Sequence, residues 1–349
     1  MLRRKTFVWF TIVVLVCGLF AGCSQSTAEE KGEKGSSKGG KIEIRIGHDS
    51  NVQHPVHKAL LEFEKSVEKK TDGKVDIKIF PAAQLGNVTD MMEQVRRGDI
   101  EMSFGASTLF SQSIPEFAVW DSFYLYDDVA HAHRVLDGKA GQELMKVLEP
   151  KGLTGLGYME IGFRNFSNSK RPIKDIADLK GLKIRGYSPI QIKAWESLNV
   201  SLTNLAWPEV FTSLQQNLID GQESATTSFY EAKFYEAQKY WSLTKHIYTD
   251  YLWYANKEFM NNLSAEEKQI IEEEAKAAID LERELMAKQE EETLAMLPDL
   301  GIKVNEVSLE ERRKMGKIMN KAVKKDIVDK AGQELYELVI TEVEAQRKK

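Results

Sequence analysis

The chain has 349 residues, of which 42% are hydrophobic and 29% are charged, an ordinary composition for a globular protein. This length exceeds what one small core needs, so we expect two lobes. The net charge of −5 argues against nucleic acid as a partner, because nucleic-acid-binding proteins present a basic surface with interleaved aromatic residues. Both cysteines, Cys17 and Cys23, lie near the N-terminus, so the rest of the chain has no disulfide framework, thiolate nucleophile or thiolate metal site.

Residues 1–22 have the pattern of a signal peptide. Three basic residues at positions 3–5 precede an apolar run, Thr6–Leu19, which is short for a membrane span. The run ends in Leu-Phe-Ala-Gly-Cys, which looks like a bacterial lipobox and predicts that Cys23 carries a lipid on the extracytoplasmic side of a membrane. An uncleaved membrane anchor is the alternative. Residues 23–40 are rich in Ser, Gly, Glu and Lys and predict a flexible tether.

The next hundred residues alternate between predicted strands and helices. Apolar and polar residues alternate over 41–46, 75–80 and 100–104, which is typical of half-buried strands. A helix is expected to begin at Pro55, and a second one carries Met91 and Met92 on its inner face. This order of strands with helical connections predicts a parallel sheet.

The middle of the chain holds loops and a helix over 108–160, and then a further set of short elements. Leu182–Arg185 alternates like a half-buried strand, so Arg185 stands at a strand end, where open α/β sheets place their ligands. A turn is predicted at Asp220-Gly221-Gln222-Glu223, a helical segment over Ser228–Trp241, and a strand over Tyr248–Ala255.

The last third is predominantly helical. Ser264-Ala-Glu-Glu is a capping box, and no Pro or Gly follows until Pro298, which predicts one helix about 50 Å long. An edge strand is expected over Gly301–Val307, followed by solvated C-terminal helices. The glutamate runs 272–274 and 290–292 are interpreted as a wet face of the long helix.

Several of these motifs together resemble the solute-binding proteins of tripartite ATP-independent periplasmic (TRAP) transporters, the DctP-like family. The similarity extends from Ile42 to the C-terminus and is most specific over Gly162–Arg185 and the Asp-Gly-Gln-Glu segment. It implies an α/β, two-lobed periplasmic-binding-protein-like fold with hinge strands and one long helix bracing both lobes. We expect residues 41–160 plus 249–285 to form lobe I, and residues 161–248 plus 286–349 to form lobe II.

Two arginines are the main candidates for ligand binding. A guanidinium stays charged and donates two parallel hydrogen bonds, which suits a carboxylate. The resemblance implies that Arg185, in Lys-Ile-Arg, clamps the ligand carboxylate and that Arg164, in Gly-Phe-Arg, adds a second contact. Trp207 matches an aromatic position against the ligand. Surface salt bridging of the arginines and core packing of the tryptophan are the alternative interpretations.

Weaker candidates come from the same resemblance. Ser224 and Ser188 stand where some relatives have Asn, and Ala106 stands where sialic-acid binders have Glu, which argues against sialic acid. Asp49 and Asn87 match first-lobe loop positions that can face the cleft, or they are only loop hydrogen-bonding residues.

We therefore expect an extracytoplasmic binding protein, not an enzyme, that captures an organic acid anion, either a sugar acid or a C4-dicarboxylate. The resemblance implies delivery to the small and large integral membrane subunits of a TRAP transporter. We expect a monomer without cofactor or metal, because the histidine pairs at 54/57 and 131/133 have no third ligand at metal spacing. A binding protein of an ABC-type importer and a secreted hydrolase or lyase acting on acidic sugars remain alternatives.

Overall fold

The structure is a computed structural model that describes residues 40–205 and 207–347, without the side chain of Pro208. The predicted signal peptide, Cys23 and nearly all of the predicted tether lie outside the described residues. Within the described part, no helix is both long and apolar enough to cross a membrane.

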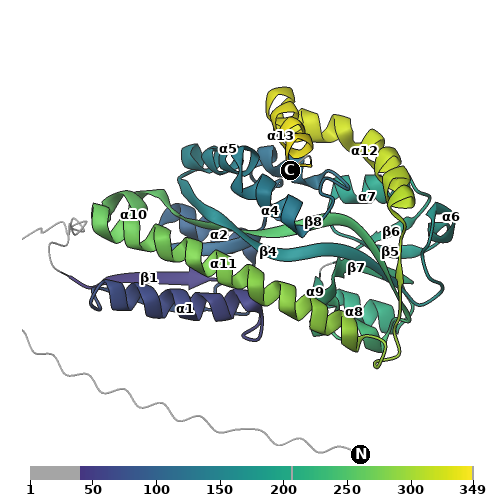
Figure 1. The fold of residues 1–349 in the computed structure, drawn as a ribbon, viewed down its shortest axis with the longest axis horizontal. Coiled ribbons are helices and arrows are strands. Elements are labelled where there is room, and N and C mark those ends of the chain that lie inside the picture. The colour runs from purple at the N-terminus through teal and green to yellow at the C-terminus, as the bar shows by residue number, and fades with distance from the viewer. Residues whose placement is uncertain (1–39, 206, 348–349) are drawn as a thin grey trace, which may run out of the picture. The chain divides into compact units, whose positions relative to one another are not determined.

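One nine-stranded sheet forms the frame of the described residues, and its two longest strands, β4 and β8, pair antiparallel in the middle (Figure 1). On one side of this pair lie β3, β1 and β2, and on the other lie β7, β5 and β6. The predicted parallel arrangement is confirmed for β1 with β2 and β3, and β5 is likewise parallel to β6 and β7. The strands are β1 Ile42–Gly47, β2 Val75–Phe80, β3 Met102–Ala106, β4 Leu153–Asn168, β5 Lys183–Gly186, β6 Ser201–Asn204, β7 Gly221–Ala225, β8 Tyr240–Asn256 and β9 Lys303–Glu306.

Helices connect the strands and cover the sheet. Three short 3₁₀ segments are η1 Pro115–Asp121, η2 Glu149–Lys151 and η3 Phe234–Glu236. The α-helices are α1 Pro55–Lys70, α2 Val88–Arg97, α3 Ser107–Phe110, α4 Val129–Asp137, α5 Lys139–Leu148, α6 Ile176–Leu179, α7 Pro189–Glu196, α8 Trp207–Gln215, α9 Thr226–Glu231, α10 Lys257–Asn262, α11 Ala265–Met296, α12 Leu309–Ala331 and α13 Gln333–Gln346.

The predicted long helix is α11. Ser264 accepts a hydrogen bond from the Glu267 backbone N–H, and the Glu267 side chain accepts one from the Ser264 N–H, so the predicted capping box is present. Its 32 residues correspond to about 48 Å. The helix packs against α1, β4 and α9, and therefore contacts both ends of the sheet (Figure 1).

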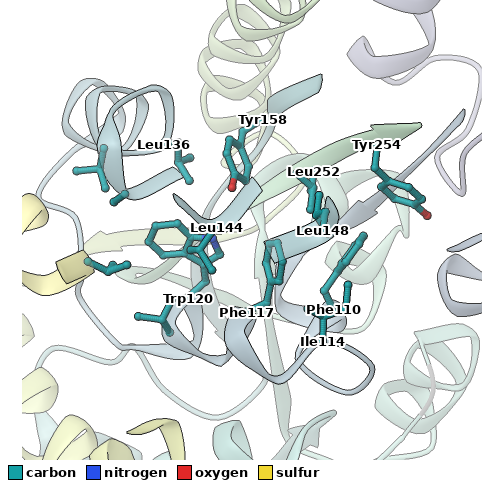
Figure 2. Close-up of a cluster of buried hydrophobic side chains, with 14 of the residues drawn as sticks. Phe110, Ile114, Phe117, Trp120, Leu136, Leu144, Leu148, Tyr158, Leu252 and Tyr254 are labelled. Atoms are coloured by element: carbon teal, nitrogen blue, oxygen red, sulfur yellow. The ribbon is translucent and has the colours of Figure 1, made fainter. Parts of the chain in front are cut away.

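Buried apolar side chains form separate cores along the sheet. Figure 2 shows one of them, in which Trp120, Phe117 and Leu144 pack with Tyr158 of β4 and Leu252 of β8. A second core joins β1–β3 to α1 and α11, and two more lie around β5–β7. The central strands therefore link regions that each bury their own apolar side chains.

Two predictions for the middle of the chain are wrong. The predicted turn at 220–223 is largely strand, because Gly221–Ala225 is the buried β7, paired antiparallel with β4. A Cβ on Gly221 would lie 2.1 Å from the Ser167 carbonyl oxygen. The glycine therefore allows β7 to lie close to β4. The predicted helix over Ser228–Trp241 is also too long, since α9 ends at Glu231 and β8 begins at Tyr240.

Candidate functional site

A cavity of about 450 Å³ lies beside the central strands, and its walls come from segments far apart in the chain. One wall follows the ends of β1 and β3, and the other is built by the ends of β5 and β7 and the starts of α8 and α9. The first wall includes Asp49, Asn51, His54 and Ala106, and the second includes Arg185, Tyr187, Trp207, Ser224 and Glu231. The cavity has the size and concavity of a small-molecule site.

Six of the eight predicted ligand-contacting residues line this cavity. They are Arg185, Arg164, Trp207, Ser224, Asp49 and Ala106. The other two do not line it. The side chain of Asn87 caps α2 by accepting from the Asp90 N–H, and that of Ser188 caps α7 by accepting from the Gln191 N–H.

Arg185 is the penultimate residue of β5 and is 9% exposed. Its guanidinium carbon lies 5.0 Å from the ring centre of Tyr187 and 5.2 Å from that of Trp207, so two aromatic faces hold the cation. The Nε atom donates to the Leu205 carbonyl at 3.0 Å. Among the described residues no carboxylate pairs with this guanidinium, and its Nη groups have no acceptor.

Burial, and then the neighbouring Arg164 charge, lower the pKa of Arg185 to about 10. The group is therefore still a cation at neutral pH. A charge that is buried without a counter-ion is unfavourable, so a ligand anion in the cavity would relieve it.

Trp207 begins α8 and is 38% exposed, which excludes the core-packing interpretation. Its ring contacts Phe234 at a centroid distance of 5.0 Å and faces Arg185. The tryptophan is thus supported from behind by an aromatic ring and presents an apolar surface beside the cation.

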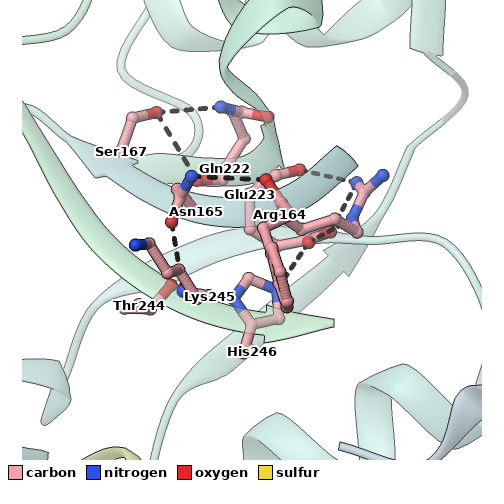
Figure 3. Close-up of polar contacts among 9 residues, drawn as sticks. Arg164, Asn165, Ser167, Gln222, Glu223, Thr244, Lys245 and His246 are labelled. Atoms are coloured by element: carbon pink, nitrogen blue, oxygen red, sulfur yellow. Dashed lines mark hydrogen bonds and ion pairs between the residues drawn. The ribbon is translucent and has the colours of Figure 1, made fainter. Parts of the chain in front are cut away.

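Arg164 differs from Arg185 because it already has a counter-ion (Figure 3). Its Nε donates to Glu223 Oε2 at 2.5 Å and its Nη2 donates to Oε1 at 2.9 Å, a bidentate pair that joins β4 to β7. Burial alone would lower the pKa of Arg164, but the Glu223 charge more than offsets this and raises it. Burial likewise opposes ionisation of Glu223, and the Arg164 and His246 contacts nevertheless lower its pKa.

His246 supports Glu223 from the far side. Its Nε2 lies 2.8 Å from Glu223 Oε2, and its Nδ1 lies 2.8 Å from Thr244 Oγ1 (Figure 3). Burial lowers the pKa of His246 despite the nearby carboxylate, so the neutral ring donates from Nε2 and accepts at Nδ1.

A bulge in β8 places this histidine. Phe166 pairs with Ser242 and Arg164 with Ile247, so one residue of β4 faces four residues of β8. Lys245 within the bulge has φ of 47°, and its backbone N–H donates to Asn165 Oδ1 at 3.0 Å. Bulges re-aim side chains beside functional sites, and here the extra residues turn His246 toward Glu223.

The first wall carries Asp49, and Asn51 on the same wall is hydrogen bonded across the cavity to Glu231 of the second wall. Asn51 Nδ2 donates to Glu231 Oε2 at 2.8 Å, and the Tyr251 hydroxyl donates to Asp49 Oδ1 at 3.3 Å. His54 caps α1, and burial lowers its pKa to about 4, so it is neutral. Asp49 and Glu231 therefore place carboxylate oxygens on both walls of the cavity.

The sequence interpretation did not select several of these residues. Tyr187 follows Arg185 by two positions, and Glu223 belongs to the Asp-Gly-Gln-Glu segment, so both stood next to recognised motifs. Asn51, Glu231 and Tyr251 carry no local motif, because they meet only when α9 and β8 are placed against the segment after β1.

The remaining polar candidates have partners within the protein. His131 Nε2 lies 2.9 Å from the Val343 carbonyl and His133 Nε2 lies 2.9 Å from Glu160 Oε2. In the part of the chain that the structure describes, no group of three or more His, Cys, Asp or Glu side chains is placed to hold a metal ion. The prediction that residues 290–292 form a solvent-exposed face is wrong for Glu290, which accepts a hydrogen bond from Thr226 Oγ1 at 2.6 Å.

Residues 46–329 match the family described as bacterial extracellular solute-binding protein, family 7 (DctP). The 2,3-diketo-L-gulonate-binding periplasmic protein YiaO of Escherichia coli strain K12 is 34% identical over 295 residues, which are 84% of this chain and 86% of that protein.

Two solved structures are similar over most of the chain. A TRAP periplasmic solute binding protein from Ochrobactrum anthropi, with its C-terminus bound in the ligand binding pocket, has a TM-score of 0.85 and 30% identity over 88% of this chain and 97% of its own. The sugar acid binding protein DctPAm from Advenella mimigardefordensis strain DPN7T, in complex with galactonate, has a TM-score of 0.80 and 31% identity over 88% of this chain and 99% of its own.

Proposed function

Because the chain belongs to the DctP family of TRAP solute-binding proteins, we propose that it captures a monocarboxylate sugar acid in the cavity between β5 and the segment after β1. The predicted family, the α/β fold with its long helix, and the extracytoplasmic role of a non-enzymatic binding protein are confirmed by this membership. It also decides against the ABC-type importer and the hydrolase or lyase.

The observation that carries the proposal is the difference between the two arginines. Arg164 is neutralised by Glu223, whereas Arg185 has no carboxylate partner among the described residues. One cation without a carboxylate partner in the cavity calls for one carboxylate, and its Nη groups, which have no acceptor among the described residues, offer the bidentate geometry that guanidinium prefers.

The carboxylates of Asp49 and Glu231 favour a polyhydroxylated ligand over a dicarboxylate. A second carboxylate would approach Asp49 and Glu231 and be repelled, whereas hydroxyl groups can donate to their oxygens. Ser224 is 1% exposed, and its Oγ has no partner in the described part of the protein, which leaves it available to a ligand hydroxyl. Trp207 would cover a carbon face of the ligand.

The experiment compares melting temperatures with galactonate, other aldonates and uronates, and succinate. A true ligand stabilises by mass action, by about 2.7 kcal/mol at a hundredfold excess over its Kd. We expect galactonate-like acids to stabilise the wild type and the matched control Arg97→Ala, whose arginine pairs with Asp99 on the surface, but not Arg185→Ala. An unchanged response in Arg185→Ala would remove this arginine from the site. Stabilisation by succinate alone would establish the dicarboxylate alternative.

The lobes, anchor and partners complete the proposal. Residues 41–160 with 249–285 and residues 161–248 with 286–349 would close on the ligand, supported by the separate cores at the two ends of the sheet. The closed monomer would dock on the small and large TRAP membrane subunits while Cys23 holds it at the membrane. Labelling with a palmitate analogue tests the anchor, and equal labelling of wild type and Cys23→Ala would exclude it.

A further inference from the structure

A second cavity, of about 390 Å³, lies between α12, the segment Phe123–Asp127 and the end of α13, and we call it the α12 groove. It shares no lining residue with the first cavity. Among the residues that line it are Tyr124, Leu309, Arg312, Arg313, Lys317 and Arg347.

The walls of the groove are fixed by local packing. A Cβ on Gly316 of α12 would lie 2.8 Å from Tyr124 Cδ2, so the glycine allows the helix to approach this ring. Asn320 holds the same segment through two hydrogen bonds, donating to the Phe123 carbonyl at 2.8 Å and accepting from the Phe123 N–H at 2.9 Å. Tyr124 adopts φ of 54°, and an uncommon backbone conformation of this kind persists only where its surroundings hold it.

The groove has an excess of positive charge that the described residues do not neutralise. Its two carboxylates, Asp127 and Glu344, both pair with Arg347. Arg312, Arg313 and Lys317 lie on one face of α12 and have no ion pair among the described residues. Since the whole chain carries a net charge of −5, this local excess does not follow from the overall composition.

Arg312 is the clearest sign that the groove lacks a hydrogen-bond acceptor. Its Nε is shielded from solvent and has no hydrogen-bond partner in the part of the chain described. A buried donor left without an acceptor is unfavourable, and more so when the group is charged. An anion lodged between α12 and Tyr124 would supply that acceptor.

We propose that the α12 groove binds a small organic anion, a carboxylate or phosphate ester with a flat apolar part, independently of the ligand in the first cavity. The anionic group pairs with Arg312, Arg313 and Lys317, and the apolar part lies against Tyr124 and Leu309. The volume lies within the range of small-molecule sites, and the preformed walls reduce the ordering cost of binding.

The test uses 4-bromobenzoate as the probe and titration calorimetry on the Arg185→Gln background, so that the first cavity does not contribute its main cation. We expect one saturable site. Replacing two exposed groove cations in Arg313→Gln/Lys317→Gln should weaken the affinity about tenfold, the size of one lost charged hydrogen bond. The control Lys321→Gln/Lys325→Gln removes the same charge from α12 outside the groove and should leave the affinity unchanged.

Crystals soaked with the probe locate it directly, because bromine gives an anomalous peak. A peak beside Tyr124 with the carboxylate at Arg312 supports the proposal, and a peak confined to the first cavity overturns it. Absence of saturable binding on the Arg185→Gln background also overturns it, as does equal weakening in the groove and control variants. If the wild type instead co-sediments with phosphatidylglycerol vesicles through these cations and does not bind the probe, the groove is a membrane contact and the small-anion proposal fails.

Discussion

A buried arginine is stable only where negative charge or polar groups face it, and the two arginines of the cavity satisfy this condition differently. Arg164 has a bidentate carboxylate that is itself supported by His246. Arg185 has two aromatic faces and one backbone carbonyl. We infer that Arg164 is primarily part of the frame and that Arg185 is the residue left for the ligand.

Glu223→Gln tests this division at the level of stability. The substitution leaves the Arg164 charge buried without its counter-ion, and breaking a buried pair in this way costs about 3–5 kcal/mol. We expect urea unfolding at neutral pH to show a loss of that size. The control is Asp326→Asn, which removes an exposed partner of Lys193 and should change stability by less than about 1 kcal/mol. Equal effects in both variants would mean that the buried pair contributes no more than a surface pair.

Asp250 gives a prediction about pH. It is 2% exposed, its Oδ1 accepts from Ser107 Oγ at 2.8 Å, and burial raises its pKa to about 7. Between its ordinary value of about 3.8 and 7 the folded chain therefore keeps a proton that the unfolded chain has lost. This carboxyl makes the folded state lose stability as pH rises through that window, by at most about 1.4 kcal/mol per pH unit.

Asp250→Asn should remove that dependence while keeping an oxygen for Ser107. Buried histidines with lowered pKa values, such as His54, act in the opposite direction, so the total pH profile is not the informative quantity. The measurement is the difference in unfolding free energy between variant and wild type, from urea curves at pH 5 and pH 8. We expect the variant to gain stability relative to the wild type at the higher pH. A difference that does not change with pH would show that Asp250 titrates normally.

At the scale of elements, the bulge of β8 connects the frame to both cavities. His246 within it bonds Glu223 on one side, and its carbonyl accepts from the Tyr124 N–H at 2.7 Å on the other. The bulge requires a left-handed residue at Lys245, a conformation that costs an L-residue about 1–2 kcal/mol and is least compatible with β-branched side chains.

Lys245→Val should therefore destabilise the protein by about 1–2 kcal/mol, whereas Lys245→Gly should be nearly neutral because glycine adopts this φ readily. Thermal unfolding of the two variants compares them directly. If the valine variant unfolded at the same temperature as the glycine variant, residue 245 would not adopt the left-handed conformation.

Local patterns predicted the elements whose own residues determine them. The alternation of β1 and β2, the capping box of α11 and the strand that ends at Arg185 are all readable within a few residues. The full length of β8 was not readable, because its first half is a strand only through pairing with β4 and β9. For the same reason Gly221 was interpreted as a turn, although it is the glycine that lets two strands approach.

The candidate site divides in the same way. Arg185, Trp207 and Ser224 were found because they stand in or beside recognisable motifs of the second half of the chain. Asn87 and Ser188 match site positions in sequence, but their side chains cap helices α2 and α7 and do not line the cavity. Asn51 and Glu231 were missed because their contact spans 180 residues, and a separation of that size leaves no local signal.

At the scale of the whole molecule, contacts between the two proposed lobes bridge the cavity. Asn51 after β1 donates to Glu231 of α9, and Gln289 of α11 donates to the other oxygen of that carboxylate at 3.1 Å. The long helix thus fixes one end of an interaction that crosses the cavity. A ligand that touches both walls favours the closed arrangement, and this hydrogen bond adds to the same preference.

Asn51→Ala should therefore weaken ligand binding without touching Arg185. Loss of a hydrogen bond to a charged group corresponds to about a tenfold rise in Kd, mainly through faster dissociation because the open form is reached more readily. Trp207 lines the cavity and supplies a fluorescence signal for equilibrium and stopped-flow measurements, with Trp207→Phe identifying its share of the signal. The matched control is Gln53→Ala. Gln53 is exposed, and only its backbone N–H contacts Asn51, by donating to Oδ1, so the substitution keeps that hydrogen bond. If Asn51→Ala binds and releases the ligand at wild-type rates, closure does not depend on this contact, and the two walls are held together by the helix and the central strands alone.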